Sequence, residues 1–348
     1  MEDVPGKQRH VLVGIGGISL ATILVLGLLY SSAGPDLADA SLGSRIAGGG
    51  RAILEHLGTL LRDHPEFLLP LLVCELAVQL SKGLKWTAIL RTVHPVRYSS
   101  ALSGVVVGAA ATHLIPFRLD ELLRTGVVAR REGIAPALVF GTVLVDRIVD
   151  VFILGCLLAA LSLFLVDGLE GPMATACWIL GVGFVVVVVG CLALLRWESS
   201  LVARLPESPL GQRIAGWLVS LAQGLRSIPR GRNLVLLAVG VIGEWTATIL
   251  FYLLILAMAG VLASPALSVI LALGNSISYA VPGLPGALGL FEWVQGSMLS
   301  HIGNLPRAEA NALALSAHAI LMLPVTLAGL VVGLLEWRKG LLLHSGSE

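Results

Sequence analysis

The chain has 348 residues, of which 56% are hydrophobic and only 13% are charged. A soluble domain carries about 25% charged residues, and one soluble core does not bury this much apolar sequence, so the composition excludes an ordinary soluble protein. The net charge of +1 and the 5% of aromatic residues offer no basic face for nucleic acid. We therefore predict an all-α polytopic membrane protein, with residues 1–348 forming a single integral membrane domain.

Eight apolar segments follow one another, and most are long enough for the roughly 20 residues that cross a bilayer. These segments are 11–30, 67–90, 98–117, 136–166, 172–195, 234–260, 265–281 and 308–335. Between them lie two amphipathic stretches, 42–62 and 210–228, and two short segments, 118–131 and 283–300. We interpret the first segment as a retained span, because it is longer than the core of a typical signal peptide. The alternative is a cleaved signal peptide.

The order of these segments repeats at a nearly constant offset of 166–171 positions. The paired landmarks are Arg45 to Gly48 with Arg213 to Gly216, Glu75 with Glu244, Pro116 with Pro282 and Pro285, Glu121 with Glu292, and Arg147 with His318. This pattern predicts an internal duplication, with repeat one at about 10–170 and repeat two at about 171–340. The alternative is the loose self-alignment that any apolar sequence gives.

The distribution of basic residues indicates the topology. If 98–131 and 265–300 each enter the membrane and return to the same side, each half has three spans plus one re-entrant helical hairpin. Both chain ends and the basic runs 82–131 and 196–232 then lie in the cytoplasm. Only Arg45, Arg51, Arg62 and Arg307 lie outside. Three spans per half make the two repeats inverted, as in many secondary transporters. If both segments cross fully, each half has four spans, the repeats are parallel, and the basic residues divide less cleanly.

The first charged cluster lies next to an apolar run, at a point where the helix must break. Pro116 suits the first turn of a new helix, which places Asp120 and Glu121 near the positive end of the helix dipole. Arg118 with Glu121, and Asp120 with Arg124, have the spacing of helical ion pairs. We interpret this cluster as a half-helix that starts at membrane depth with its N–H groups directed at a lipid phosphate. The alternative is a cytoplasmic turn with solvated ion pairs.

The second cluster, Asp146, Arg147 and Asp150, lies inside the apolar run 136–166. Ionised side chains in a span are costly unless they are paired or hydrated, so they usually face the interior of the bundle. Helical spacing puts Arg147 and Asp150 on adjacent turns. We expect this cluster to join the first cluster in one site; the alternative is a self-compensated structural ion pair.

The third feature is a break between 275 and 292 that contains two prolines and three glycines. Its candidate substrate-binding residues are Asn275, Tyr279, Pro285, Gly286 and Glu292. Irregular backbone at bilayer depth is tolerated only where protein buries it or where it lines a wet cavity. We therefore predict a second half-helix here, with an ordinary extracellular loop as the alternative.

Other polar residues in apolar segments are weaker candidates. Secondary site residues are His113, Glu75, Glu244 and His318. His318 is typical of a hydrogen-bonded core histidine, and Trp86, Trp197 and Trp337 are typical of interfacial anchors. The four cysteines, Cys74, Cys156, Cys177 and Cys191, lie in apolar runs without a CxxC pair, and we interpret them as small buried hydrophobes. No HExxH, P-loop or GxSxG motif occurs, so we expect no enzyme, no catalytic residue, no metal and no cofactor.

At these same residues the chain resembles the lysylphosphatidylglycerol synthase transmembrane family, a flippase-like membrane domain. The resemblance covers roughly residues 10–340 and rests on three ordered motifs. They are Pro116-Phe-Arg118-Leu-Asp120-Glu121-Leu-Leu-Arg124, Asp146-Arg147-Ile-Val-Asp150 and Pro285-Gly286-Ala-Leu-Gly289-Leu-Phe-Glu292. The chain departs from the family pattern at Asp120 and Ala287, each in place of a glycine, and at Thr112-His113, where an asparagine is common.

The resemblance implies lipid translocation in the bacterial inner membrane by a multi-pass protein with cytoplasmic termini. The soluble aminoacyl-transferase domain of bifunctional members is not expected here. Candidate substrates are an anionic or aminoacylated phospholipid, a polyprenyl-phosphate and a hopanoid-type lipid. The alternatives are a non-transporting accessory protein that binds a lipid or a glycosyltransferase in envelope synthesis, and an intramembrane transferase. Candidate protein partners are a second copy of the chain and an envelope-biosynthesis enzyme; no nucleic acid is expected.

Overall fold

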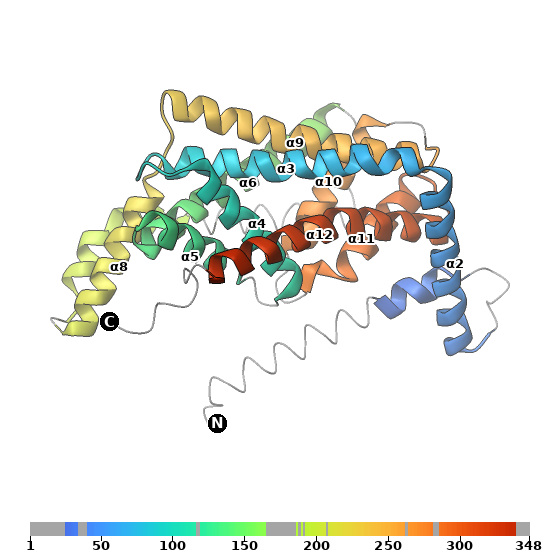
Figure 1. Cartoon of the computed structure of the whole chain (residues 1–348), viewed down its shortest axis with the longest axis horizontal. Helices are drawn as coiled ribbons and strands as arrows, with labels where there is room; N and C mark the ends of the chain where they lie inside the picture. The colour runs from blue at the N-terminus through green and yellow to red at the C-terminus, as the bar shows by residue number, and fades with distance from the viewer. Residues whose placement is uncertain are drawn as a thin grey trace, which may run out of the picture. The chain divides into compact units, whose positions relative to one another are not determined.

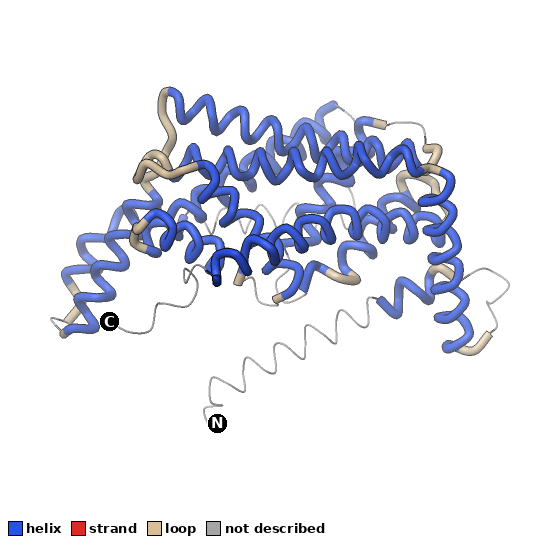
Figure 2. Tube along the Cα trace, in the orientation of Figure 1, coloured by secondary structure: helices blue, strands red, loops and turns tan. Residues whose placement is uncertain are grey.

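The computed structural model describes residues 25–33, 40–115, 119–164, 186, 189–190, 192–206, 208–261, 264–280 and 285–338. Every regular element within these residues is a helix (Figure 2). The α-helices, which are labelled in Figure 1, are α2 (Leu42–Asp63), α3 (Leu68–Leu90), α4 (Tyr98–Leu114), α5 (Asp120–Glu132), α6 (Pro136–Phe164), α8 (Pro209–Leu225), α9 (Arg232–Met258), α10 (Pro265–Ala280), α11 (Leu290–His301) and α12 (Arg307–Arg338). Two short 3-10 helices are η2 (Pro65–Phe67) and η3 (Pro285–Ala287). Residues 25–31 and 192–203 are helical as well. The predicted all-α class is confirmed.

Three of the described helical segments have the length and composition to cross a membrane. They are Pro65–Leu90, Arg232–Met258 and Arg307–Arg338, and only 22–33% of the residues in their most apolar windows are buried by protein. The remaining surface is largely apolar, with exposed leucine, isoleucine and valine side chains along α3, α9 and α12. Such exposed apolar helices are stable in lipid and unfavourable in water. The prediction of a polytopic membrane protein is therefore supported by the structure.

The helix boundaries agree with the hydropathy pattern to within a few residues. The amphipathic stretches predicted at 42–62 and 210–228 form α2 and α8. Each begins with a serine whose hydroxyl accepts a backbone N–H of the first turn, 3.3 Å from Ser41 to the Ser44 nitrogen and 3.1 Å from Ser208 to the Gly211 nitrogen. This hydrogen bond satisfies one of the donors that a helix N-terminus leaves open. The predicted span 172–195 lies mostly outside the described residues.

The short segments predicted after each break are also helical. Asp120 and Glu121 occupy the first turn of α5, as expected. The break before Glu292 contains η3 and begins α11, with positive φ angles of 58° at Gly286 and 81° at Gly289. A positive φ has no steric cost for glycine, which explains why glycines occupy these turns. Ala287 has a φ of 54°, so this position carries backbone strain where the family pattern has glycine.

The chain divides into two compact units, and the boundaries fall inside α3, α4, α9 and α12 and at the start of α5. Unit 1 comprises residues 1–76, 109–119 and 246–327, and unit 2 comprises residues 77–108, 120–245 and 328–348. Each unit draws on both halves of the sequence, so neither corresponds to one of the predicted repeats. The predicted duplication stays a prediction.

Glycines allow the helices of unit 2 to approach closely. A Cβ on Gly104 of α4 would lie 2.8 Å from Trp86 and 3.1 Å from the Arg124 carbonyl oxygen, and one on Gly108 would lie 3.2 Å from the Arg124 Cβ. In the same way, Gly240 of α9 lies against the backbone of Lys85: a Cβ added to Gly240 would lie 2.6 Å from the Lys85 backbone nitrogen. Small residues at helix contacts permit this approach in membranes. They hold α5 against α4, and α9 against α3, where the charged side chains meet.

Candidate functional site

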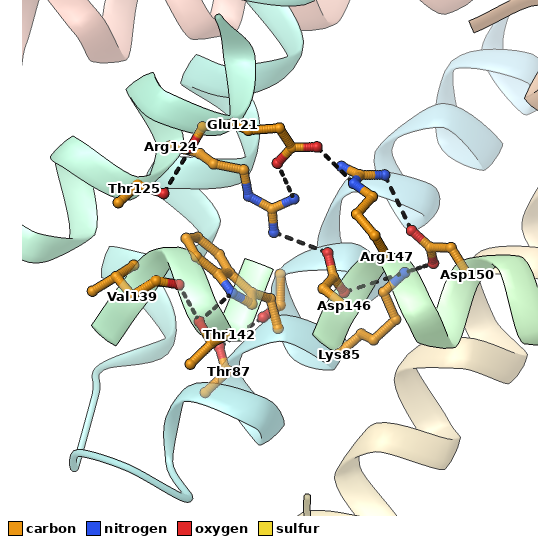
Figure 3. Close-up of polar contacts among 12 residues, drawn as sticks. Lys85, Thr87, Glu121, Arg124, Thr125, Val139, Thr142, Asp146, Arg147 and Asp150 are labelled. Carbon is orange, nitrogen blue, oxygen red and sulfur yellow. Dashed lines mark hydrogen bonds and ion pairs between the residues drawn. The ribbon is translucent and has the colours of Figure 1, made fainter. Parts of the chain in front are cut away.

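The charged side chains of unit 2 form one connected network, which we call the charged cluster. Its members are Lys85, Glu121, Arg124, Asp146, Arg147, Asp150 and Glu244 (Figure 3, which omits Glu244). Residues of α3, α5, α6 and α9 contribute to it. A network of this size inside helices with apolar surroundings is typical of a functional site in a membrane protein.

Lys85 is the most deeply buried member, with 1% of its surface exposed. Its ammonium forms an ion pair with Asp150, lies 2.7 Å from the Glu244 carboxylate and 3.5 Å from the Asp146 carboxylate. A buried ammonium is strongly unfavourable without such partners. Three acidic side chains therefore surround one cation, on α6 and α9, at a depth that water reaches poorly.

The two arginines connect α5 to α6. Arg124 donates to Asp146 over 3.0 Å and lies 3.6 Å from Glu121. Arg147 donates to Glu121 over 2.6 Å and to Asp150 over 3.1 Å. The expected meeting of the first and second clusters is confirmed by these contacts, although Arg124 pairs with Asp146 and Glu121, not with Asp120. Asp120 is buried and interacts electrostatically with Arg147, and Arg118 lies outside the described residues.

The members differ in exposure, and this difference matters for function. The Arg147 side chain is 43% exposed, whereas those of Lys85, Arg124 and Asp146 are 2–6% exposed. A guanidinium carries five N–H donors, so the two bonds of Arg147 leave donors for a further acceptor. Among the described cations of the charged cluster, Arg147 is therefore the most exposed to its surroundings.

Acidic groups outnumber basic ones in the charged cluster. Lys85, Arg124 and Arg147 face the carboxylates of Glu121, Asp146, Asp150 and Glu244. Among the described residues, three cations meet four carboxylates, so the cluster has no surplus positive charge for an anion.

Trp86 lies beside the charged cluster and is completely buried. Its indole N–H donates to the Thr142 hydroxyl over 3.1 Å, and the guanidinium of Arg124 lies 4.0 Å from the centre of its ring. The interpretation of Trp86 as an interfacial anchor was therefore wrong. Trp197 and Trp337 are about half exposed, which is compatible with that role.

Lys85 was missed as a site residue because it was counted with the cytoplasmic basic run 82–131. The sequence contained two signals against that assignment. Five residues, Trp86 to Leu90, follow Lys85 before the helix ends, so the lysine lies within the helix. The motif from Asp146 to Asp150 contains two acids and one base, so a further cation was needed for balance.

A second group of polar residues lies in unit 1 and includes most of the third predicted feature. His318 lies between two groups: its Nδ1 is 2.6 Å from a Glu292 carboxylate oxygen and its Nε2 is 3.1 Å from the Tyr279 hydroxyl. Glu292 and His318 are 3% and 2% exposed. Glu75 is buried as well and lies close enough to interact electrostatically with Tyr279. We call Glu75, Tyr279, Glu292 and His318 the relay group.

The turn before α11 is attached to this group. The second carboxylate oxygen of Glu292 accepts the Gly289 N–H over 2.7 Å, so Glu292 caps the helix that carries it. Gly286 packs near His113, with an added Cβ 3.5 Å from the His113 Cα. His113 in turn lies 2.7 Å from the Thr326 hydroxyl. The glycine turn thus brings α4, α10, α11 and α12 together.

The remaining candidates have more limited contacts. Pro285 begins η3, and Asn275 is half-buried on α10, one turn before Tyr279. Cys74 is buried as expected, but Cys156 is exposed on α6, so its interpretation as a buried hydrophobe was wrong. Cys177 and Cys191 lie outside the described residues. Within the described chain, no group of three or more His, Cys, Asp or Glu side chains is arranged to hold a metal ion.

The chain matches a known protein family over most of its length. A family described as "Lysylphosphatidylglycerol synthase TM region" matches residues 50–329. The matched range contains every member of the charged cluster and of the relay group. No curated protein and no solved structure matches the chain.

Proposed function

Because the chain belongs to the lysylphosphatidylglycerol synthase transmembrane family, we propose that it moves an amphiphilic lipid between the leaflets of the bacterial inner membrane. The observation that carries this proposal is the charged cluster, in which a half-exposed Arg147 is held by carboxylates above an almost fully buried Lys85. Lipid tails remain in the bilayer, so only the headgroup needs a polar path. The proposal includes no chemical change of the lipid.

In this mechanism the headgroup phosphate binds Arg147, and the acidic surplus of the cluster accepts a cationic group of the same headgroup. Glu121 and Asp150 orient the guanidinium through hydrogen bonds of 2.6 and 3.1 Å. A bound phosphate competes with these two carboxylates for the N–H donors of Arg147. The carboxylates that it displaces can then bind the amine of the same headgroup. Among the expected substrates, the charge balance favours an aminoacylated or zwitterionic phospholipid over a purely anionic lipid.

The proposal also includes inverted repeats with re-entrant hairpins. Helices α4 and α10 contain 17 and 16 residues, and α5 and α11 contain 13 and 12. All four are shorter than the roughly 20 residues of a full span, which supports two hairpins that enter the membrane and return. The serine caps at 41 and 208, at the same offset as the other landmarks, support the duplication. Cytoplasmic termini complete this arrangement.

The accessory protein and the intramembrane transferase make different predictions, and native mass spectrometry of the purified protein separates them. Transport predicts a bound lipid with unchanged chemistry, and Arg147→Gln should lower its occupancy. Arg226→Gln is the matched control, because Arg226 is 52% exposed and paired with Glu198 away from the cluster. A co-purified protein without lipid would favour the accessory role, and altered lipid mass after incubation would favour a transferase.

A further inference from the structure

The relay group in unit 1 takes no part in the headgroup contacts proposed for the charged cluster. Its core is a continuous hydrogen-bonded chain of three titratable side chains from α10, α11 and α12. The chain runs from Glu292 through both nitrogens of His318 to the Tyr279 hydroxyl, over 2.6 and 3.1 Å. A structural histidine needs only satisfied nitrogens, whereas this chain connects two groups that can themselves exchange protons.

We propose that the relay group binds and releases protons, and that this proton exchange drives lipid movement. With His318 neutral and Glu292 ionised, Nδ1–H donates to the carboxylate and Nε2 accepts the Tyr279 O–H. A proton that binds at Nε2 turns this nitrogen into a donor, so the Tyr279 hydroxyl must redirect its own hydrogen. The proton comes from water and returns to water, so no other reactant is needed.

The surroundings determine where the redirected hydroxyl points. The titratable groups around the chain are Glu75 on α3, His113 on α4 and Tyr252 on α9. Glu75 interacts electrostatically with Tyr279 and is an acceptor when ionised. Proton binding at His318 therefore turns the hydrogen bond of Tyr279 from α12 toward other acceptors, which include the α3 carboxylate. It also reduces the negative charge of the buried Glu292–His318 pair to zero.

The geometry around these three hydrogen-bonded side chains supports proton exchange in preference to a fixed ion pair. Glu292 is oriented by the Gly289 N–H, and His318 stacks on Phe291 with ring centres 4.2 Å apart. The Glu292 carboxylate and the His318 ring are thus both held in place, as efficient proton transfer between them requires. By contrast, the nearby Tyr252 hydroxyl bonds to Gln295 over 3.2 Å, and an amide side chain does not titrate.

The test uses the full protein in vesicles of phosphatidylethanolamine and phosphatidylglycerol, with a trace of phosphatidylethanolamine that carries a dithionite-sensitive fluorophore on one acyl chain and keeps its free amine. For one-to-one exchange, a gradient of one pH unit shifts the steady-state ratio of labelled lipid between leaflets by up to about tenfold. We expect this shift for the unmodified protein and for Tyr252→Phe. We expect His318→Gln to equilibrate the lipid without responding to the gradient.

This inference rests on the proposed function for its lipid readout, and a second readout keeps the two separable. A pH-sensitive dye inside the same vesicles reports proton entry driven by a potassium diffusion potential. Lipid movement that ignores the gradient, or a His318→Gln protein that still responds, overturns the relay and leaves the flippase intact. If the unmodified protein moves no lipid, the flippase proposal fails, and proton entry that is lost in His318→Gln still supports the relay. Absence of both movements overturns both.

Discussion

Replacing Lys85 by methionine tests whether the charged cluster is a true buried network. Methionine keeps the length and apolar stem of the lysine but removes the ammonium that pairs with Asp150 and Glu244. Removing one partner from a buried ion pair costs about 3–5 kcal/mol, since the remaining charge stays buried without compensation. We therefore expect Lys85→Met to lower the free energy of unfolding by about this amount.

The measurement is reversible unfolding of the purified protein in mixed micelles, followed by circular dichroism. Lys82→Met is the matched control, because Lys82 lies one turn away on α3 and no ion pair with a described residue holds it. Its effect should stay within about 0.5 kcal/mol. Adding Glu244→Gln to Lys85→Met should recover about 0.5–3 kcal/mol relative to the sum of the single changes. Equal stability of Lys85→Met and Lys82→Met would refute the reasoning.

Three further changes test how α3, α4 and α5 pack around the charged cluster. Gly104→Ala places a methyl group 2.8 Å from Trp86 and should lower the free energy of unfolding by about 1–3 kcal/mol. Gly126→Ala, whose methyl group meets no atom within 4 Å, should raise it by about 0.5–1 kcal/mol. If both variants changed the free energy of unfolding in the same direction, the packing described for Gly104 would be contradicted. Trp86→Phe removes the hydrogen bond from the indole N–H to Thr142 and should lower the free energy of unfolding by about 1–3 kcal/mol. The blue-shifted emission of this buried indole should also be missing from the spectrum of the folded variant. An unchanged unfolding curve would mean that this hydrogen bond contributes nothing to stability.

The helices could be predicted from the sequence because the bilayer imposes a simple rule on it. A long apolar run must satisfy its backbone within a helix, so the segments 67–90, 234–260 and 308–335 agree closely with the observed helices. Even the short helix after Pro116 was predictable, since its acidic first turn follows a proline. Charges inside a span predicted that the motif from Asp146 to Asp150 would find partners, and it does.

The side-chain partners could not be predicted to the same extent. Lys85 and Asp150 are 65 positions apart, and their contact depends on how α3 lies against α6. The contact of Lys85 with Glu244 depends in turn on the close approach of α9 to α3 at Gly240. The pairing of Glu292 with His318 depends likewise on the turn at Gly286. The first two predicted features meet in the charged cluster of unit 2, and the third lies in the relay group of unit 1. One shared site formed by all three features stays a prediction.

Headgroup translocation by the reconstituted protein tests the central claim most directly. Vesicles containing the unmodified protein or Arg226→Gln should expose a fluorescent aminoacylated or zwitterionic lipid from the inner leaflet to dithionite much faster than empty vesicles. Arg147→Gln, folded to the same extent by gel filtration, should bring the rate close to that of empty vesicles. Full activity in Arg147→Gln would contradict the account, since the charged cluster would then have no part in moving the headgroup.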